Sequence, residues 1–227
     1  IAARAVLARN GVETEAVHPG CCGMPKFEHG DIERVAANAK RVSAKLVSWI
    51  DRGYDIVALV PSCALMLKFE WPMILPEDDI VKRLAGATWD LSEYVVDIAR
   101  NEGRAPGLAR LDGGVAIHIA CHARAQNVGN KAADMLKLLP DTDIEIIDRC
   151  SGHGGSWGMM KGNFETAIKV GRPVARRAAE AAKSHVVSEC PLAAIHIRQG
   201  MKTLNSEPPA STPHPIELMA RAYGIGS

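Results

Sequence analysis

The sequence predicts an α/β protein whose two halves repeat an order of strand, cysteine-bearing loop and helix. Short apolar runs, such as residues 54–60 and 115–120, are typical of strands buried on both faces of a parallel sheet. Helical periodicity follows these runs, as expected when crossover helices join parallel strands. The C-C-G of residues 21–23 and the C-S-G of residues 150–152 lie 129 positions apart. We therefore expect two tandem Rossmann-like parallel-sheet repeats, with cysteine loops at the carboxyl edges of their strands.

The composition is that of an ordinary globular protein and argues against several functions. Of the 227 residues, 47% are hydrophobic and 23% charged, and the net charge of +1 argues against a nucleic-acid partner. No apolar run reaches the roughly 18 residues that span a bilayer, and no signal-peptide pattern is present. Six cysteines in a chain of this length favour reduced, metal-binding thiols in the cytoplasm over a disulfide scaffold. Because Ile1 begins inside a helix-like pattern, we expect the N-terminus to be truncated.

The first repeat, residues 1–70, is expected to alternate helices and strands. Apolar and polar residues alternate over 12–17, which indicates a strand leading to the cysteine pair. Asp31 is expected to cap a long helix with one apolar stripe. In order, we expect a helix at 1–9, a strand at 12–17, a helix at 31–52, a strand at 54–60 and a helix at 64–70.

Residues 71–112 contain no cysteine and are expected to form a helical bridge between the repeats. Pro72 and Pro76 interrupt the preceding pattern, and amphipathic helices are predicted at 78–84 and 91–101. The glycines between 103 and 114 indicate a connector.

The second repeat, residues 113–205, is expected to contain more strands than the first. Strands are predicted at 115–120, 144–147 and 185–187, and helices at 130–139, 163–183 and 193–201. Residues 206–227 read as a proline-rich tail with a last short helix near 216–223.

The cysteines are the candidate functional residues. Each is expected just after the carboxyl end of a strand, the edge at which open α/β sheets bind ligands. The vicinal pair lies between Gly20 and Gly23, and adjacent thiolates suit a multi-metal cluster better than tetrahedral zinc, which prefers C-x₂₋₄-C spacing. The candidate ligands are Cys21, Cys22, Cys63, Cys121, Cys150 and Cys190. His122 and His153, beside cysteines, are candidate additional ligands.

Four stretches resemble one known family. They are the G-C-C-G of residues 20–23, the P-S-C of 61–63, the C-H-A-R of 121–124 and the E-C-P of 189–191. They are similar to the cysteine-rich CCG domain family. That family includes the B subunit of heterodisulfide reductase, the iron–sulfur C subunit of anaerobic glycerol-3-phosphate dehydrogenase, and iron–sulfur subunits of glycolate and lactate oxidation complexes. Its pattern is a lone Cys, then Cys-Cys-Gly, then Cys-x-x-Cys, usually present twice.

The resemblance implies an electron-carrying subunit whose cysteines hold an iron–sulfur cluster, expected to be of the 4Fe-4S type. It implies an oxidoreductase function, in which electrons pass from a flavoprotein dehydrogenase or other redox subunit to an acceptor, or reduce a bound disulfide. It also implies a cytoplasmic protein that can associate with the inner face of the membrane through a partner.

The sequence departs from the family pattern in both repeats. The lone cysteine of the first repeat would precede Ile1, and Ser151 replaces one member of the second pair. Each Cys-x-x-Cys has lost one cysteine, at Val60 in the first repeat and at Ala193 in the second. Each half thus keeps three cysteines, one short of a Cys₄ set. The fourth ligand could come from an upstream cysteine, His122, His153, Ser151, a substrate or the other half.

Two alternatives stay open at this point. Three cysteines and a histidine also suit a zinc-stabilised binding module. A metal-free thiol oxidoreductase, with Cys21 or Cys22 as nucleophile, is the other. Arg124 and Arg149, next to cysteines, could lower thiol pKa values, whereas His29, His185, His196 and His214 carry no supporting spacing.

Overall fold

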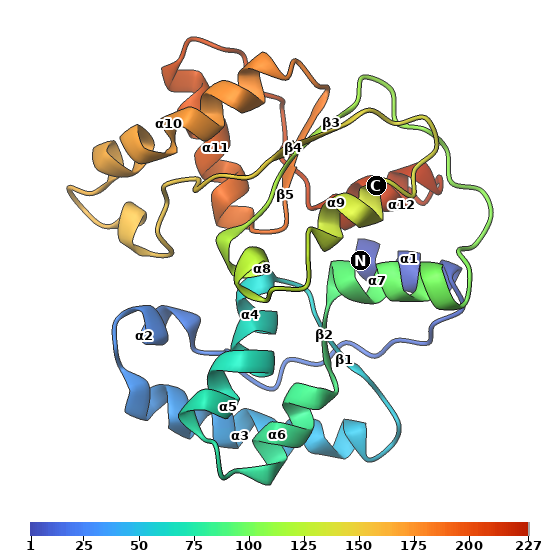
Figure 1. Ribbon diagram of the computed structural model, residues 1–227, viewed down its shortest axis with the longest axis vertical. Helices are drawn as coiled ribbons and strands as arrows, with labels where there is room; N and C mark the ends of the chain where they lie inside the picture. The colour runs from blue at the N-terminus through green and yellow to red at the C-terminus, as the bar shows by residue number, and fades with distance from the viewer. Residues whose placement is uncertain (227) are drawn as a thin grey trace.

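The computed structural model describes residues 1–226 and has two lobes, each containing a small parallel sheet (Figure 1). The sheet of the first lobe pairs β1 (Ile56–Ala58) with β2 (Thr88–Asp90). In the second lobe, β3 (Val115–His118) lies between β4 (Ile144–Ile147) and β5 (His185–Ser188), all parallel. The predicted α/β class with tandem parallel-sheet repeats is therefore confirmed.

The core of the first lobe lies between α3 (Ile32–Ile50) and the chain that follows β1. Asp31 caps α3 by accepting a hydrogen bond from the Arg34 backbone N–H, as the sequence predicted. The buried stripe of α3 packs against the fully buried Trp71 and Leu84. The other helices of this lobe are α2 (Met24–Glu28), α4 (Pro61–Leu65), the π-helix η1 (Met66–Glu70), α5 (Trp71–Ile74) and α6 (Asp79–Gly86).

The second lobe is a three-layer sandwich, because alternate residues of β3 face opposite cores. Val115 and Ile117 belong to one apolar cluster, and Ala116 belongs to another on the opposite face. The first face is covered by α7 (Leu91–Asn101) and α9 (Lys131–Leu136), the second by α10 (Phe164–Glu180) and α11 (Pro191–Thr203). Short helices α8 (Cys121–Ala125) and η2 (Trp157–Met159) lie in its loops.

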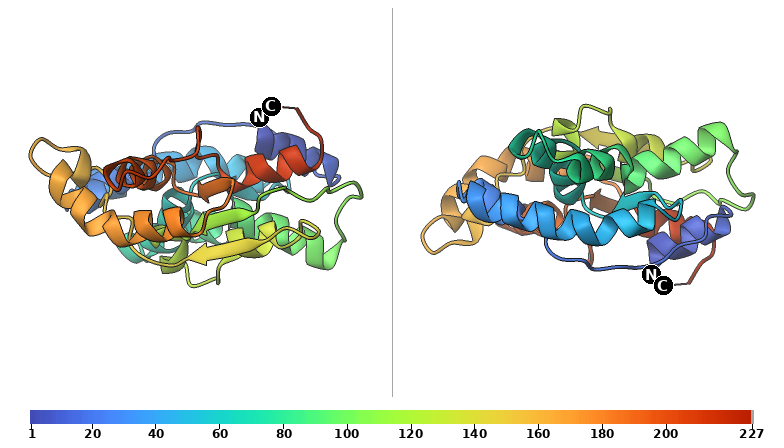
Figure 2. Two further views of the ribbon diagram at one scale, coloured as in Figure 1. Left: turned by 90° about the horizontal axis from the view of Figure 1, so that it is seen from above. Right: turned by 90° about the horizontal axis from the view of Figure 1, so that it is seen from below.

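The two ends of the chain pack together in the second lobe. Val6 and Leu7 of α1 (Ala2–Arg9) share an apolar cluster with Ile216 and Leu218 of α12 (Pro215–Ala222). Figure 2 shows α1, at the blue end of the colour bar, beside α12, in red. The chain thus begins against the second lobe, forms the first lobe and returns. No helix among residues 1–226 is long and apolar enough to cross a bilayer.

Several sequence-based expectations for the first lobe were wrong. Residues 12–17 form no strand, because this exposed segment has no neighbouring strand to pair with. Only three residues of the apolar run 54–60 form β1, and they are half-buried, because β2 is their single partner. The strand β2 was missed and lies in the stretch expected to form a helical bridge, between the two helices predicted there. The helix expected at 64–70 begins at Pro61 and continues through Pro72 by way of a π-helical turn.

Candidate metal centre

All six cysteines are free thiols in loops or at the first turns of helices. Cys121 is the first residue of α8, after β3, and Cys150 follows β4. Cys63 is the third residue of α4, after β1, and Cys190 is the N-cap of α11, after β5. These four lie where the sequence predicted, beyond strand carboxyl ends. Cys21 and Cys22 do not follow a strand, because residues 12–17 are unpaired.

The two lobes repeat the same local geometry at their first cysteine. The Gly23 backbone N–H donates to Cys21 Sγ at 3.3 Å, and the Gly152 N–H donates to Cys150 Sγ at 3.4 Å. Both glycines have φ of 87°, a left-handed conformation that glycine adopts without steric cost. The sequence repeat of residues 21–23 and 150–152 is therefore also a repeat of amide-to-sulfur contacts.

The lobes also share the way in which the helix after one strand begins, after β1 in the first lobe and after β5 in the second. Pro61 and Pro191 occupy the first turns of α4 and α11, after the N-caps Val60 and Cys190. In a Cys-x-x-Cys placed here, one cysteine is the N-cap and the other the third helical residue. The first lobe keeps the helical position, as Cys63, whereas the second lobe keeps the N-cap.

In the first lobe, the structure brings the three thiols together. Cys22 is 8% exposed, and the thiols of Cys63 and Cys21 lie close enough to it to shift its pKa. The interaction with Cys63, together with burial, raises the pKa of Cys22 far above its usual value, whereas the same interaction lowers the pKa of Cys63. The pair therefore favours a thiolate at Cys63. Trp71 Nε1 donates to the Cys22 carbonyl at 3.1 Å and fixes the loop.

In the second lobe, Cys190, Cys121 and His153 lie near one another. His153 Nε2 is 3.9 Å from Cys190 Sγ, and Cys121 is close enough to Cys190 to raise its pKa, although burial is the larger cause. Ser151 Oγ is 2.9 Å from His153 Nδ1 and holds the ring in place. Burial, followed by the nearby His196, lowers the pKa of His153 to about 4, so the ring is neutral at physiological pH.

Charged and exposed groups surround the cysteines of the second lobe. Arg124 Nη2 donates to Cys121 Sγ at 3.4 Å, and Arg124 Nη1 pairs with Asp148 at 2.8 Å. His122 lies next to Cys121 and adds a small repulsion that lowers the pKa of His153. Cys150 is exposed and contacts the backbone of its own loop.

The chain within residues 1–226 contains no group of three His, Cys, Asp or Glu side chains close enough to hold a single metal ion. A tetrahedral zinc ion needs four ligands within about 2.3 Å of one point. A cluster binds each thiolate to a different iron, so its ligands need not converge on one point. The donors themselves fit a cluster: soft thiolates with backbone amides directed at the sulfur.

The two lobes meet through polar contacts beside the cysteines. Gln126, 2% exposed, donates from Nε2 to the Pro61 carbonyl at 3.4 Å and to Asp90 Oδ2 at 3.3 Å. It thereby links α8, which begins at Cys121, to the start of α4. Across the same boundary, His29 Nε2 is 3.2 Å from Ser156 Oγ.

A buried carboxyl pair lies in this boundary. Glu189 is 3% exposed and accepts from Ser92 Oγ at 2.8 Å. Burial, then the charge of Asp90, raises the pKa of Glu189 to about 8, and burial also raises the pKa of Asp90. Glu189 and Asp90 come together only because elements far apart in the sequence meet here, so no local sequence signal identifies this pair.

Sequence reasoning also missed two histidines. His118 was assigned nothing, yet it is 1% exposed and both ring nitrogens have partners. His196 was judged ordinary, and its ring centroid lies 6.4 Å from that of His153. His196 faces His153 because the helical register of α11 turns it to the buried side of the helix.

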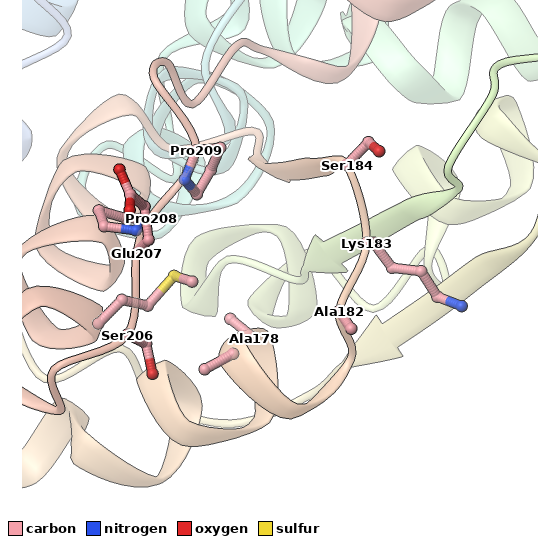
Figure 3. Close-up of a pocket in the computed structure, with 10 residues that line it drawn as sticks. Ala178, Ala182, Lys183, Ser184, Ser206, Glu207, Pro208 and Pro209 are labelled. Carbon is pink, nitrogen blue, oxygen red and sulfur yellow. The ribbon is translucent and has the colours of Figure 1, made fainter.

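A separate cavity of about 540 Å³ lies at the opposite end of β5, between the end of α10 and residues 206–209 (Figure 3). Lys183 and Ser184 line it at the amino end of the strand, and none of its lining residues is a cysteine or histidine. The cavity is therefore not part of the cysteine centre.

The chain is similar in sequence to several known proteins. The chain is 25% identical over 204 residues to the C subunit of anaerobic glycerol-3-phosphate dehydrogenase of Escherichia coli (strain K12), covering 89% of the chain and 49% of that protein. It is 28% identical over 154 residues to lactate utilization protein A of Lysinibacillus sphaericus, covering 63% of each. It is 27% identical over 192 residues to an uncharacterized iron–sulfur protein of Methanocaldococcus jannaschii, covering 82% of the chain and 35% of that protein.

The chain spans about half the length of the dehydrogenase protein and less than two thirds of the other two relatives. The family "Cysteine-rich domain" (CCG) matches residues 1–68 and 115–198, which together include all six cysteines. On this match, the chain belongs to the cysteine-rich CCG domain family.

Proposed function

We propose that this chain is an iron–sulfur subunit of an oxidoreductase, and that its cysteines hold at least one cluster that relays electrons. The observation that carries the proposal is the amide-to-sulfur contact repeated at Cys21 and Cys150. Hydrogen bonds to cysteine sulfur are one of the means by which proteins raise the reduction potential of a cluster. Zinc has no redox chemistry for such contacts to adjust.

The proposed ligands fall into one set per lobe. Cys21, Cys22 and Cys63 form the first set, and Cys121, Cys150 and Cys190 the second. The 4Fe-4S type is our proposal, because cysteine thiolates are the usual ligands of such clusters. When bound, the cluster supplies one-electron transfer, and the protein sets its potential and access.

For the second set, the structure favours His153 over His122 as an additional ligand. His153 Nε2 already faces Cys190 Sγ, at 3.9 Å. Its other ring nitrogen is held by Ser151, the arrangement that orients a ligating histidine. Ser151, the residue that replaces a cysteine, thus acts through His153 in this proposal.

The proposed partner is a flavoprotein dehydrogenase or another redox protein, and any membrane contact would be made through it. The support is that one relative is named as part of a dehydrogenase. In the first lobe, where three thiols have no histidine proposed beside them, a cluster would keep an open position, so reduction of a bound disulfide is the second reaction that we propose to test. We also keep the division into repeats at 1–70 and 113–205, joined by 71–112, as a proposal.

The test is to compare single cysteine variants in full-length protein purified without oxygen. Cys63→Ser and Cys190→Ser each remove one thiol from a different lobe, and each should lower bound iron and change the paramagnetic resonance signal. Ser43→Ala is the matched control, because Ser43 is buried in α3 and its hydroxyl has no partner within residues 1–226. Iron that is unchanged in both cysteine variants would contradict the proposal.

The same samples separate the two alternatives. Zinc without sulfide would favour the binding module, which the chemistry of three cysteines and a histidine permits. Absence of any metal would leave a thiol oxidoreductase. For that function, the raised pKa of Cys22 argues against Cys22 as nucleophile, and the lowered pKa of Cys63 favours Cys63.

A further inference from the structure

His118, the last residue of β3, connects the ends of all three strands in the second lobe. Its side chain is buried at the level of the sheet. Nδ1 lies 3.0 Å from Ser188 Oγ on β5, and Nε2 lies 2.9 Å from the Arg149 carbonyl, just beyond β4. β3 is the central strand, so one side chain reaches both of its neighbours.

The partners fix the direction of every hydrogen bond in this group. A carbonyl oxygen only accepts, so Nε2 of His118 carries the proton and donates to Arg149. Nδ1 of the neutral ring then accepts from the hydroxyl of Ser188. The Ser188 oxygen in turn accepts from the Cys190 backbone N–H, at 3.3 Å. Burial, which lowers the pKa of His118, is consistent with this neutral ring.

The result is one continuous chain of hydrogen bonds from Cys190 to Arg149. Arg149 immediately precedes Cys150, Ser188 is two residues before Cys190, and His118 is three residues before Cys121. This series of hydrogen bonds therefore includes Cys190 itself, the residue before Cys150, and a residue three positions before Cys121.

We propose that His118 is a positioning residue that, with Ser188, sets the relative positions of Cys121, Cys150 and Cys190. This inference rests on the proposed function for its purpose, but the positioning itself is a property of the metal-free chain. A residue that served only core packing would need no donor aimed at the loop of Cys150 and no acceptor aimed at the end of β5. Loss of one buried hydrogen bond should loosen the Cys190 loop without opening the first lobe.

The first test measures the alkylation rate of each cysteine by peptide mass spectrometry, using iodoacetamide on the full metal-free chain. Cys190 is partly buried, so its rate reports opening of the loop. Ser188→Ala removes the hydroxyl that bonds both His118 Nδ1 and the Cys190 N–H, and His118→Leu removes the ring that bonds Ser188 and Arg149. In each variant the Cys190 rate should rise at least about tenfold, because the loss of even one buried hydrogen bond shifts a local opening equilibrium by about that factor. The rate at Cys22, in the first lobe, should stay unchanged.

The control is Ile117→Val, on the same strand and in the apolar cluster against which Cys190 also packs, so it tests a loss of packing near Cys190. It removes one buried methylene and lowers stability without touching the hydrogen bonds. An unchanged Cys190 rate in Ser188→Ala, or an equal rise at Cys22 and Cys190, would overturn the proposal. A rise at Cys190 in Ile117→Val as large as in Ser188→Ala would also overturn it.

A second readout uses the chain loaded with iron and sulfide without oxygen. Ser188→Ala should retain less iron, Ser188→Thr should restore it through its hydroxyl, and Ile117→Val should match wild type. If Ser188→Thr behaved as Ser188→Ala in both readouts, the hydroxyl would have no positioning role. If wild type held no iron but Cys190 still reacted faster in Ser188→Ala, the proposed function would fail and the positioning role would stand.

Discussion

Substitution of Gly171 tests how the second cysteine loop is held against its helix. Gly171 is a buried residue of α10, and a Cβ at this position would lie 2.1 Å from the Ser151 carbonyl oxygen. Gly152 approaches from the other side, where a Cβ would lie 2.4 Å from the Ala167 carbonyl oxygen. The loop and the helix therefore pack backbone against backbone, and Gly171→Ala must displace the loop that carries Cys150 and His153.

The expected cost follows from two opposing effects. Overpacking of this kind costs about 1–3 kcal/mol. Replacing glycine by alanine inside a helix stabilises it by about 1 kcal/mol. We therefore expect Gly171→Ala to lower the free energy of unfolding by about 1 kcal/mol, which is a fall of about 2–4 °C in Tm for a chain of this size.

Gly86→Ala is the control for helix propensity. Gly86 is the last residue of α6, and a Cβ there would meet no atom within 4 Å. This variant should be as stable as wild type or slightly more stable. The assay is thermal and denaturant unfolding, together with the iron retained after anaerobic loading. If Gly171→Ala were as stable as Gly86→Ala and retained wild-type iron, the close packing of loop on helix would be refuted.

Three further predictions concern groups outside that loop. Burial lowers the pKa of His214 from 6.5 to about 4, and its Nδ1 accepts from the Ile216 N–H at 3.2 Å, so the fold favours the neutral ring. The stability that neutral His214 contributes to the fold is present above pH 6.5 and decreases as the pH falls towards 4, by about 2 kcal/mol between pH 8 and pH 5. His214→Asn keeps an acceptor for the helix cap but has no titrating ring, so urea titrations of this variant should show no such pH dependence. Gln126→Ala removes the amide that donates to the Pro61 carbonyl and to Asp90 Oδ2, and it should cost about 1–3 kcal/mol, measured by denaturant unfolding; an unchanged midpoint would show that the contact between the lobes is dispensable. Trp71→Phe removes the donor to the Cys22 carbonyl and should speed alkylation of Cys22, whereas an unchanged rate would mean that the loop is held by other contacts.

The elements that the sequence predicted well carry their signal within one segment. The helix α3 has its cap at Asp31 and its apolar stripe three to four residues apart, so its start and buried face follow from the sequence. The three strands of the second lobe are short apolar runs, and each was placed within two residues. Strand pairing is different, because it depends on a distant neighbour: residues 12–17 alternate like a strand but have none.

The cysteines were found because vicinal thiols between glycines are chemically unusual. The residues that hold them were not, because their roles arise where elements meet. His118 is a single polar residue in an apolar strand, and its partners are 31 and 70 positions away. Gln126 likewise contacts Pro61, 65 positions earlier. Periodicity and motif spacing carry no information about such contacts.

The central claim is that the thiols hold an iron–sulfur cluster. The most direct measurement is iron and acid-labile sulfide content, with electron paramagnetic resonance, on full-length protein purified without oxygen. Our account predicts about four irons and four sulfides for each bound cluster, with a resonance signal that appears on oxidation or reduction. Zinc without sulfide, or no metal at all, would contradict it.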